Sequence, residues 1–217
     1  MEPLRGVLAA DERERAARFV FERDRRRFEV ARGALRVLLG RYLDAEPAAL
    51  QFAYGPAGKP SLRRAGGGPP LEFNLSHSGG LALVAVARGR AVGVDLEAER
   101  PLRDLAGMAR ASFSPAERRG LEGLAEDARV GRFFRIWTAK EAYLKATGEG
   151  FQRPLDSFDV AVAGPGEPRL ERVEGRPHEP TRWRFHRLDP GPGWTAAVAV
   201  EEPAGALHRW RAEPLLG

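Results

Sequence analysis

The chain has 217 residues, enough for one large domain or two small ones, and its 43% hydrophobic and 30% charged residues are typical of a globular protein. Neither its hydropathy nor its first residues, MEPLRGVLAADERER, predict a membrane span or a signal peptide, so we expect a cytoplasmic protein. The lack of cysteine excludes disulfides, thiolate nucleophiles and cysteine-ligated zinc, and the four histidines are scattered. Any metal should therefore be a hard ion bound by carboxylates.

The net charge of +5 is concentrated near the N-terminus, where residues 11–41 carry ten arginines and six acidic residues. Such an excess suggests a polyanionic partner, which could be nucleic acid, an anionic nucleotide or an acidic protein surface. The simpler interpretation is a solvated helix face with Arg–Glu pairs. Nucleic acid is not favoured, because no aromatic-rich basic strand or zinc-finger pattern accompanies the run.

In the first half of the chain, the apolar spacing of residues 21–43 predicts an amphipathic helix that ends before Pro47. Residues 53–70 are rich in glycine and proline and predict a surface loop. Residues 71–97 follow as three short strands, with turns at residues 78–80 and 88–90.

The second half begins with a helix at SPAERRGLEGL, in which Ser114 is the N-cap, Pro115 takes the first position and Glu117 completes a capping box. A longer helix is predicted from about Gly131 to Thr147, and it ends at Gly148. Further strands follow. Helices and mainly antiparallel strands together predict the α+β class.

The two halves share one plan. Residues 72–97 and 184–210 each show an aromatic strand, a glycine-containing turn, an Ala/Val-rich strand, a second turn and another strand, and a long helix precedes each block. This pattern favours two similar lobes related by a pseudo-twofold axis, each a long helix on a small sheet, although shared β composition is the alternative. We expect lobes at residues 1–100 and 101–217 with a cleft between them.

Two carboxylates lie in the segment VGVDLE. Asp95 and Glu97 are two positions apart on a predicted strand, so their side chains share one face while Val94 and Leu96 share the other. A neighbouring Mg²⁺ would turn their repulsion into binding, since Mg²⁺ prefers oxygen ligands. A solvated strand end is the alternative.

On the long helix, Trp137, Glu141 and Lys145 follow one another at four-residue intervals and share a face. Glu141 could complete a metal site and Lys145 could contact a phosphate oxygen. The alternatives are a surface ion pair for these two and a core position for Trp137. The chain has only three lysines, Lys59, Lys140 and Lys145, against 32 arginines, which suggests that lysine is kept where guanidinium does not suit.

The segments FNLSHSGG, VGVDLE, FSPAE and FFRIWTAKEAYLKATGEGF, in this order and at these separations, resemble the 4′-phosphopantetheinyl transferases of the surfactin-synthetase-activating type. The resemblance implies an enzyme that moves the phosphopantetheine arm of coenzyme A to a serine of an apo acyl or peptidyl carrier protein, with release of adenosine 3′,5′-bisphosphate. It also implies two similar lobes with the site between them. We further expect a monomer, and a carrier with an acidic helix beside the serine.

The resemblance also implies residue roles. Mg²⁺ would be held by Asp95, Glu97 and Glu141. His77 and Lys145, with Ser76 beside them, would hold the pyrophosphate, and Glu141 would take the serine proton directly or through a water. Two further cations would contact coenzyme A phosphates: Lys59 of YGPAGKP, and Arg27 at the 3′-phosphate, where Arg26 and Arg32 compete for the role. Glu117 and Lys140 are expected to support the metal ligands.

Two other classes of function stay open at this point. A Mg²⁺-dependent nuclease or phosphodiesterase could use the same carboxylates with a nearby lysine, but would leave His77 and Trp137 without a role. A binding module without activity would explain the basic N-terminal helix but not three acidic residues on facing elements.

Overall fold

The computed structural model describes residues 2–63, 68–164 and 166–212, so that residues 64–67 of the predicted glycine-rich loop lie outside the described part. Helices and small antiparallel sheets confirm the α+β class. The chain forms two compact units, Met1–Ala53 with Gly205–Gly217, and Tyr54–Ala204. The boundary expected after residue 100 falls inside the second unit, because the strand that ends there is hydrogen-bonded to a strand near residue 200. The pseudo-twofold relation of two lobes stays a prediction.

The first unit is helical, with α1 (Glu2–Gly6), α2 (Ala10–Ala17), α3 (Glu22–Leu43) and the 3-10 turn η1 (Pro47–Ala49). The predicted amphipathic helix is confirmed as α3, whose C-cap Asp44 has a left-handed backbone with φ 49°. Leu35 and Leu39 on α3 are fully buried, together with Leu8 before α2. This small apolar core holds α1 and α2 against α3.

A buried ion cluster lies in the same unit. Glu12 on α2 accepts hydrogen bonds from the guanidinium groups of Arg32 and Arg36 on α3, at 2.5 and 2.6 Å. Arg36 also donates to the carbonyls of Pro47 and Leu50, so its charge is well compensated. Burial by itself raises the pKa of Glu12, but the hydrogen bonds from Arg36, from the Ala9 N–H and from Arg32 outweigh it, and the pKa is lowered.

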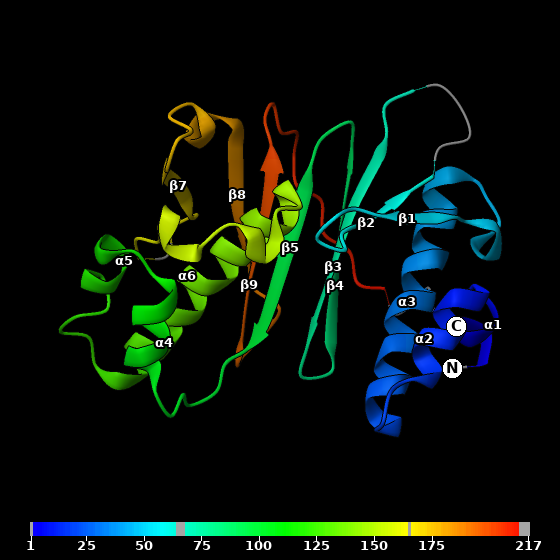
Figure 1. Cartoon of the computed structure of the whole chain (residues 1–217), viewed down its shortest axis with the longest axis horizontal. Coiled ribbons are helices and arrows are strands. Elements are labelled where there is room, and N and C mark those ends of the chain that lie inside the picture. The colour runs from blue at the N-terminus through cyan, green and yellow to red at the C-terminus, as the bar shows by residue number, and fades with distance from the viewer. Residues whose placement is uncertain (1, 64–67, 165, 213–217) are drawn as a thin grey trace. The chain divides into compact units, whose positions relative to one another are not determined.

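The second unit is built around an antiparallel sheet in the order β5-β9-β8. A hairpin of β3 and β4 packs against β5, and the pair β6-β7 lies near the other end of the unit (Figure 1). The turns predicted at residues 78–80 and 88–90 are confirmed. The strands are β1 (Phe52–Tyr54, at the junction of the units), β2 (Pro60–Leu62), β3 (Leu71–Ser78), β4 (Leu81–Arg88), β5 (Val92–Ala98), β6 (Phe158–Ala161), β7 (Arg169–Val173), β8 (Trp183–Leu188) and β9 (Trp194–Glu201).

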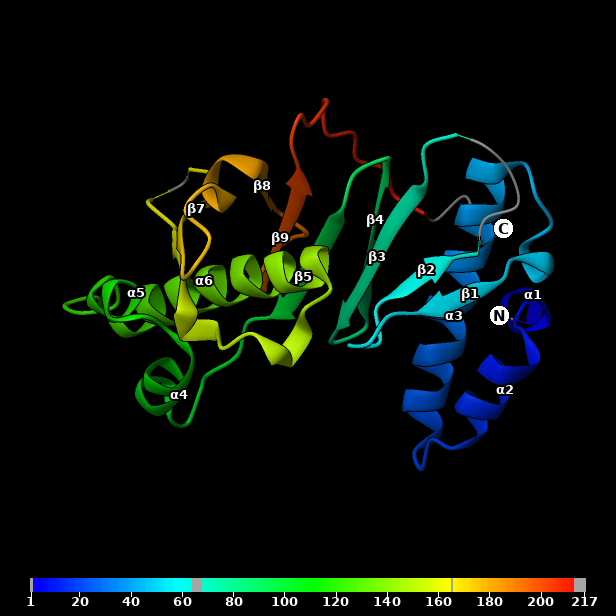
Figure 2. The same cartoon turned by 45° about the horizontal axis from the view of Figure 1, so that its top comes forward.

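The long helix α6 (Glu126–Thr147) packs along β5 and β9 of this sheet, as Figure 2 shows. Its closest approach is at Gly93 on β5, where an added Cβ would lie 2.1 Å from the Ala142 carbonyl oxygen and 2.3 Å from the Ala146 nitrogen. Only glycine allows the strand to come so near the helix backbone. The glycine of VGVDLE therefore sets the distance between the strand and the helix that carry the predicted site.

Shorter helices accompany α6: α4 (Leu105–Ser112), α5 (Pro115–Arg119) and the 3-10 turns η2 (Gly150–Gln152), η3 (Leu155–Ser157) and η4 (Glu179–Arg182). The capping box predicted for α5 is confirmed, since the Ser114 hydroxyl accepts from the Glu117 N–H and the Glu117 carboxylate accepts from the Ser114 N–H. Gly148 takes the left-handed C-cap of α6 with φ 73°, as predicted.

Two sequence-based predictions were wrong in detail. The helix expected from Gly131 begins at Glu126, because Glu126 and Asp127 in its first turn favour the positive end of the helix dipole and Gly131 is tolerated inside. The last strand expected in residues 184–210 is not formed: β9 ends at Glu201, before Pro203, which has no N–H to donate to a sheet. None of the helices in the described ranges is both long and apolar enough to cross a membrane.

Replacing Gly93 tests the strand–helix approach. We expect Gly93→Ala to lower the free energy of unfolding by about 1–3 kcal/mol or more, because the methyl group overlaps backbone atoms of α6. Gly131→Ala is the matched control: its Cβ meets nothing within 4 Å, and alanine should stabilise α6 by about 0.5–1 kcal/mol. Urea unfolding followed by tryptophan fluorescence measures both. A Gly93→Ala protein as stable as wild type would show that β5 and α6 can move apart to accept a methyl group at little cost in free energy.

The Glu12 cluster predicts an acid-sensitive contribution to stability. At neutral pH, Glu12→Gln should cost about 3–5 kcal/mol, because two arginines lose their buried counter-ion. The lowered pKa means that this stabilisation is complete above the unfolded-state value near 4.5 and is lost as the pH falls through the lower folded-state value. The difference between wild type and variant in urea unfolding, followed by far-UV circular dichroism, should therefore shrink in acid. The exposed Glu14→Gln is the control; a pH-independent difference would contradict the argument.

Candidate active site

A pocket of about 240 Å³ lies where β3, β5 and α6 meet. All of its residues belong to the second unit, and they come from both halves of the sequence. Six of the eight residues that the structure brings together here were predicted as site residues in the sequence analysis. The lining residues are Ser76, His77, Asp95, Leu96, Glu97, Trp137, Glu141 and Lys145.

Side chains of β3 bond to the backbone of β5 and join the two strands. Three alternate residues of β3 accept hydrogen bonds from three alternate N–H groups of β5, at 3.0–3.2 Å. The pairs are Asn74 with Val94, Ser76 with Leu96, and Ser78 with Ala98. The sequence prediction missed Asn74 and Ser78. Their signal is the alternation of Asn, Ser and Ser in NLSHS, which places three small polar groups on one face of a strand.

The two serines also hold the carboxylates. The Ser76 hydroxyl donates to Asp95 Oδ1 at 3.1 Å, and the Ser78 hydroxyl donates to Glu97 Oε2 at 3.1 Å. Because each hydroxyl is fixed at the same time by an N–H of β5, it can donate in one direction only. The β3 strand therefore sets the orientation of both acidic side chains of β5.

Lys145 reaches into the pocket from α6 and pairs with Asp95. Its Nζ lies 2.6 Å from Asp95 Oδ1 and 3.1 Å from the Ser76 hydroxyl. The second oxygen, Asp95 Oδ2, is buried and has no hydrogen-bond partner in the described part of the chain. A buried carboxylate oxygen without a partner is costly, so this atom is suited to a further cationic ligand.

Negative charge is crowded around the pocket. Burial raises the pKa of Glu97, and the neighbouring Asp95 raises it further. Glu141 follows the same pattern: burial raises its pKa first, then Asp95, while Lys145 opposes the rise. Each of these two carboxyl groups would ionise more readily if a cation lay among them.

These features bear on whether the pocket suits Mg²⁺. In residues 2–63, 68–164 and 166–212, no three His, Asp or Glu side chains stand close enough together to hold one ion as they are arranged. The donor chemistry does suit it, since three carboxylates and a serine hydroxyl face the same space and Asp95 Oδ2 lacks a partner. The residues present therefore fit a hard divalent cation in type and in charge.

The other predicted phosphate contacts differ in whether they line the pocket. His77 lines the pocket and is exposed. Lys59 does not line it: its ammonium donates to the carbonyls of Val92 and Ala146 at 3.2 and 2.7 Å, and burial lowers its pKa. Lys59 thus ties β5 to the last turn of α6, and its contact with a coenzyme A phosphate stays a prediction. Arg27 belongs to the first unit, so its role at the 3′-phosphate stays a prediction.

Lys140, beside Glu141 on α6, is fully buried. Its ammonium donates to both oxygens of Glu117, at 2.6 and 2.8 Å, and to the Phe158 carbonyl at 2.5 Å. Glu117 in turn accepts from the Val160 N–H, next to the irregularity in β6. Burial lowers the pKa of Lys140, against the effect of Glu117. This ion pair fixes α6 relative to α5 and β6, so both residues support the fold. Their expected support of the metal ligands stays a prediction.

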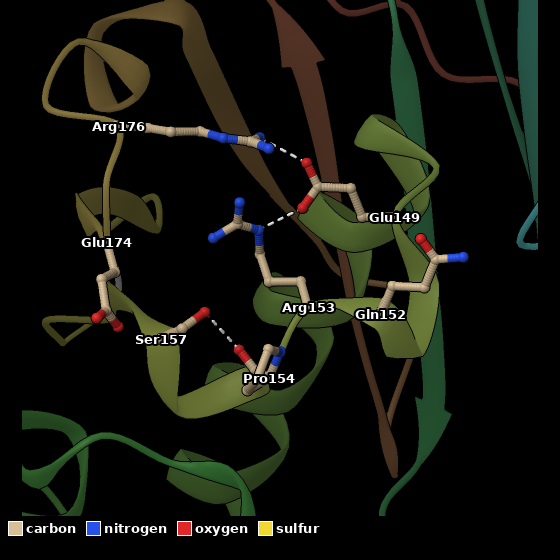
Figure 3. Close-up of a pocket in the computed structure, with 7 residues that line it drawn as sticks. All are labelled: Glu149, Gln152, Arg153, Pro154, Ser157, Glu174 and Arg176. Carbon is tan, nitrogen blue, oxygen red and sulfur yellow. Dashed lines mark hydrogen bonds and ion pairs between the residues drawn. The ribbon is translucent and has the colours of Figure 1, made fainter.

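A second hollow, of about 470 Å³, shares no residue with the carboxylate pocket (Figure 3). Its charged groups neutralise one another, because Glu149 accepts from Arg153 on one oxygen and from Arg176 on the other. Ser157 donates to the Pro154 carbonyl rather than into the hollow. These ion pairs join the loop after α6 to the turn after β7, so the cluster stabilises that loop.

The pocket unites an acidic strand, an acidic and basic helix face and a serine-rich strand, and such a set is typical of a metal-assisted phosphoryl-type transferase. Comparison with known families gives the assignment. The family described as 4′-phosphopantetheinyl transferase superfamily matches residues 91–199, and the one described as 4′-phosphopantetheinyl transferase, N-terminal, matches residues 4–89. The chain belongs to the 4′-phosphopantetheinyl transferase superfamily, and the predicted resemblance is confirmed.

Curated relatives agree along most of the chain. The 4′-phosphopantetheinyl transferase HetI of Nostoc sp. is 42% identical over 92% of this chain and 81% of that protein. The 4′-phosphopantetheinyl transferase psf-1 of Bacillus pumilus is 32% identical over 96% and 85%, and Sfp of Bacillus subtilis is 27% identical over 93% and 86%. The chain is thus a transferase that moves phosphopantetheine from coenzyme A to carrier proteins.

Removing the Ser78 hydroxyl tests the role of β3. Ser78→Ala should slow phosphopantetheine transfer by about tenfold, because Glu97 loses its donor and a hydrogen bond to a charged group is worth about 1.5–3 kcal/mol. Ser78→Thr, which keeps the hydroxyl, should restore most of the rate. Ser157→Ala, which removes a hydroxyl outside the pocket, is the control. Equal rates for Ser78→Ala and wild type would show that Glu97 needs no such support.

Proposed function

We propose that Asp95, Glu97 and Glu141 hold a Mg²⁺ ion at this pocket while phosphopantetheine is transferred. Bound there, the ion would neutralise charge on the coenzyme A pyrophosphate. The observation that carries the proposal is the pocket itself, in which three carboxylates from β5 and α6 face a lysine and a histidine and one buried carboxylate oxygen lacks a partner.

The residues of the chain divide the remaining tasks. In the reaction the carrier serine Oγ bonds to the β-phosphorus of coenzyme A, and the bond from that phosphorus to the bridging oxygen breaks, which releases adenosine 3′,5′-bisphosphate. Glu141 takes the serine proton, directly or through a water. Lys145 and His77 place positive charge or a hydrogen-bond donor beside the pyrophosphate, and Ser76 orients Lys145.

Recognition of the nucleotide and the carrier is assigned to basic residues. Arg27 on α3 remains our candidate for the adenosine 3′-phosphate: its side chain is partly exposed, and its nearest acidic group, Asp24, is 3.8 Å away. Arg32 is a weaker candidate because its guanidinium is buried against Glu12. The net charge of +5 suits a carrier with an acidic helix beside the serine. The monomeric state and the cytoplasmic location stay predictions.

A nuclease or phosphodiesterase with the same carboxylates is no longer favoured. The chain belongs to the transferase family, and a nuclease would leave His77 and Trp137 of the pocket without a role.

Transfer of a fluorescent phosphopantetheine from labelled coenzyme A to an apo carrier tests the proposal. The rate should vanish in EDTA and return with Mg²⁺, and Asp95→Asn and Glu141→Gln should each lose about 10²-fold or more. Glu99→Gln is the matched control: Glu99 follows β5 and bonds to Thr195, outside the pocket. Circular dichroism checks that each variant is folded. A full rate in EDTA would refute metal dependence, and near-normal activity of Glu141→Gln at saturating Mg²⁺ would remove that residue from both roles.

A further inference from the structure

Among the charged groups of the pocket, Lys145 has partners that a metal would also use. Its ammonium lies on Asp95 Oδ1, the carboxylate assigned to Mg²⁺, and on the Ser76 hydroxyl that orients that carboxylate. We infer that Lys145 is a built-in counter-ion of Asp95 that competes with the divalent cation, so that metal binding and release of Lys145 toward the substrate are coupled. This inference rests on the proposed Mg²⁺ site.

Charge explains the competition. An ammonium 2.6 Å from one carboxylate oxygen and a dication on the same carboxylate repel each other strongly in a partly buried pocket. If both use the same carboxylate oxygen, one of them has to move away. The cation could instead bind Asp95 Oδ2 and leave Lys145 in place, and the experiment below separates this outcome from competition.

Lys145 is the group that is able to move. Its side chain is 30% exposed and its four-carbon stem is flexible, whereas the Asp95 side chain is 6% exposed and held by Ser76. The other two lysines are fixed: Lys140 has three acceptors in the core, and Lys59 bonds to two backbone carbonyls. The backbone of α6 stays anchored by these lysines while the Lys145 head group changes partner.

The consequence is a fixed sequence of events, in which the cation binds before Lys145 contacts the substrate. Without a cation, Lys145 neutralises Asp95 and protects the pocket from the repulsion among its carboxylates. With a cation bound, the ammonium is free to meet the pyrophosphate of coenzyme A. Since coupling is reciprocal, Lys145 must weaken cation binding by the same factor by which the cation weakens the Lys145–Asp95 pair.

Calorimetric titration with Mg²⁺, in the absence of coenzyme A, tests the competition. Lys145→Met keeps the apolar stem and removes the ammonium, and it should bind Mg²⁺ about tenfold more tightly than wild type, within the usual range of coupling between sites. Arg100→Met is the matched control, because it removes a positive charge 3.9 Å from Glu97 Oε2 without any contact to Asp95. Its gain should be much smaller.

Each result decides the question. A gain confined to Lys145→Met supports the inference. Equal gains in Lys145→Met and Arg100→Met would reduce the effect to general electrostatics and overturn it, and no gain would mean that the cation and Lys145 share Asp95. If neither wild type nor Lys145→Met binds Mg²⁺, with or without coenzyme A, the metal site itself fails, and the inference fails with it.

A second measurement follows Lys145 in the wild-type protein and does not depend on the affinity of Lys145→Met for Mg²⁺. With only three lysines, a ¹⁵N-labelled chain should show few ammonium signals, and comparison with Lys145→Arg assigns that of Lys145. Mg²⁺ should abolish the slow-exchanging Lys145 signal, because its ion pair opens to water, while those of Lys59 and Lys140 persist. A Lys145 signal that stays protected in saturating Mg²⁺ would refute the release.

Discussion

The close approach of β5 to α6 is the constraint on which the rest of the structure depends. Asp95 and Glu97 stand on the strand, Glu141 and Lys145 on the helix, and their pocket exists because the two backbones nearly touch at Gly93. A side chain there would push the helix outward and separate the four groups. Lys59 acts in the same direction, since it bonds to the Val92 carbonyl on the strand side and to the Ala146 carbonyl on the helix.

Buried charge recurs as a means of fixing position. The Lys140–Glu117 pair ties α6 to α5 and β6, and the Glu12 cluster ties α2 to α3. Each has its hydrogen bonds largely satisfied, as buried ions require. The composition suggested that lysine is kept where arginine does not suit, and Lys140 is the plainest case: a compact ammonium meets three oxygens in a space without solvent, where a planar guanidinium would not fit.

Lys145 differs from these fixed ions, and the difference links structure to function. Its partner Asp95 is also our proposed Mg²⁺ ligand, so under the competition that we infer, the contact that stabilises the pocket at rest would break when the ion binds. Ser76 and Ser78 would keep the carboxylates oriented during that change, because both hydroxyls also accept hydrogen bonds from backbone N–H groups of β5.

The sequence by itself determined the elements and the residue set. Periodicity and capping predicted α3, α5 and most of α6, and the motifs VGVDLE and WTAKEAYLK predicted the acidic groups that now share a pocket. These features are local, and a residue's neighbours along the chain decide them. Tertiary structure decided the rest: that Lys59 is a tie between strand and helix, that Lys145 pairs with Asp95, and that Asn74 and Ser78 join β3 to β5. Partners 20 to 87 positions apart meet only after packing, which is why spacing alone could not assign them.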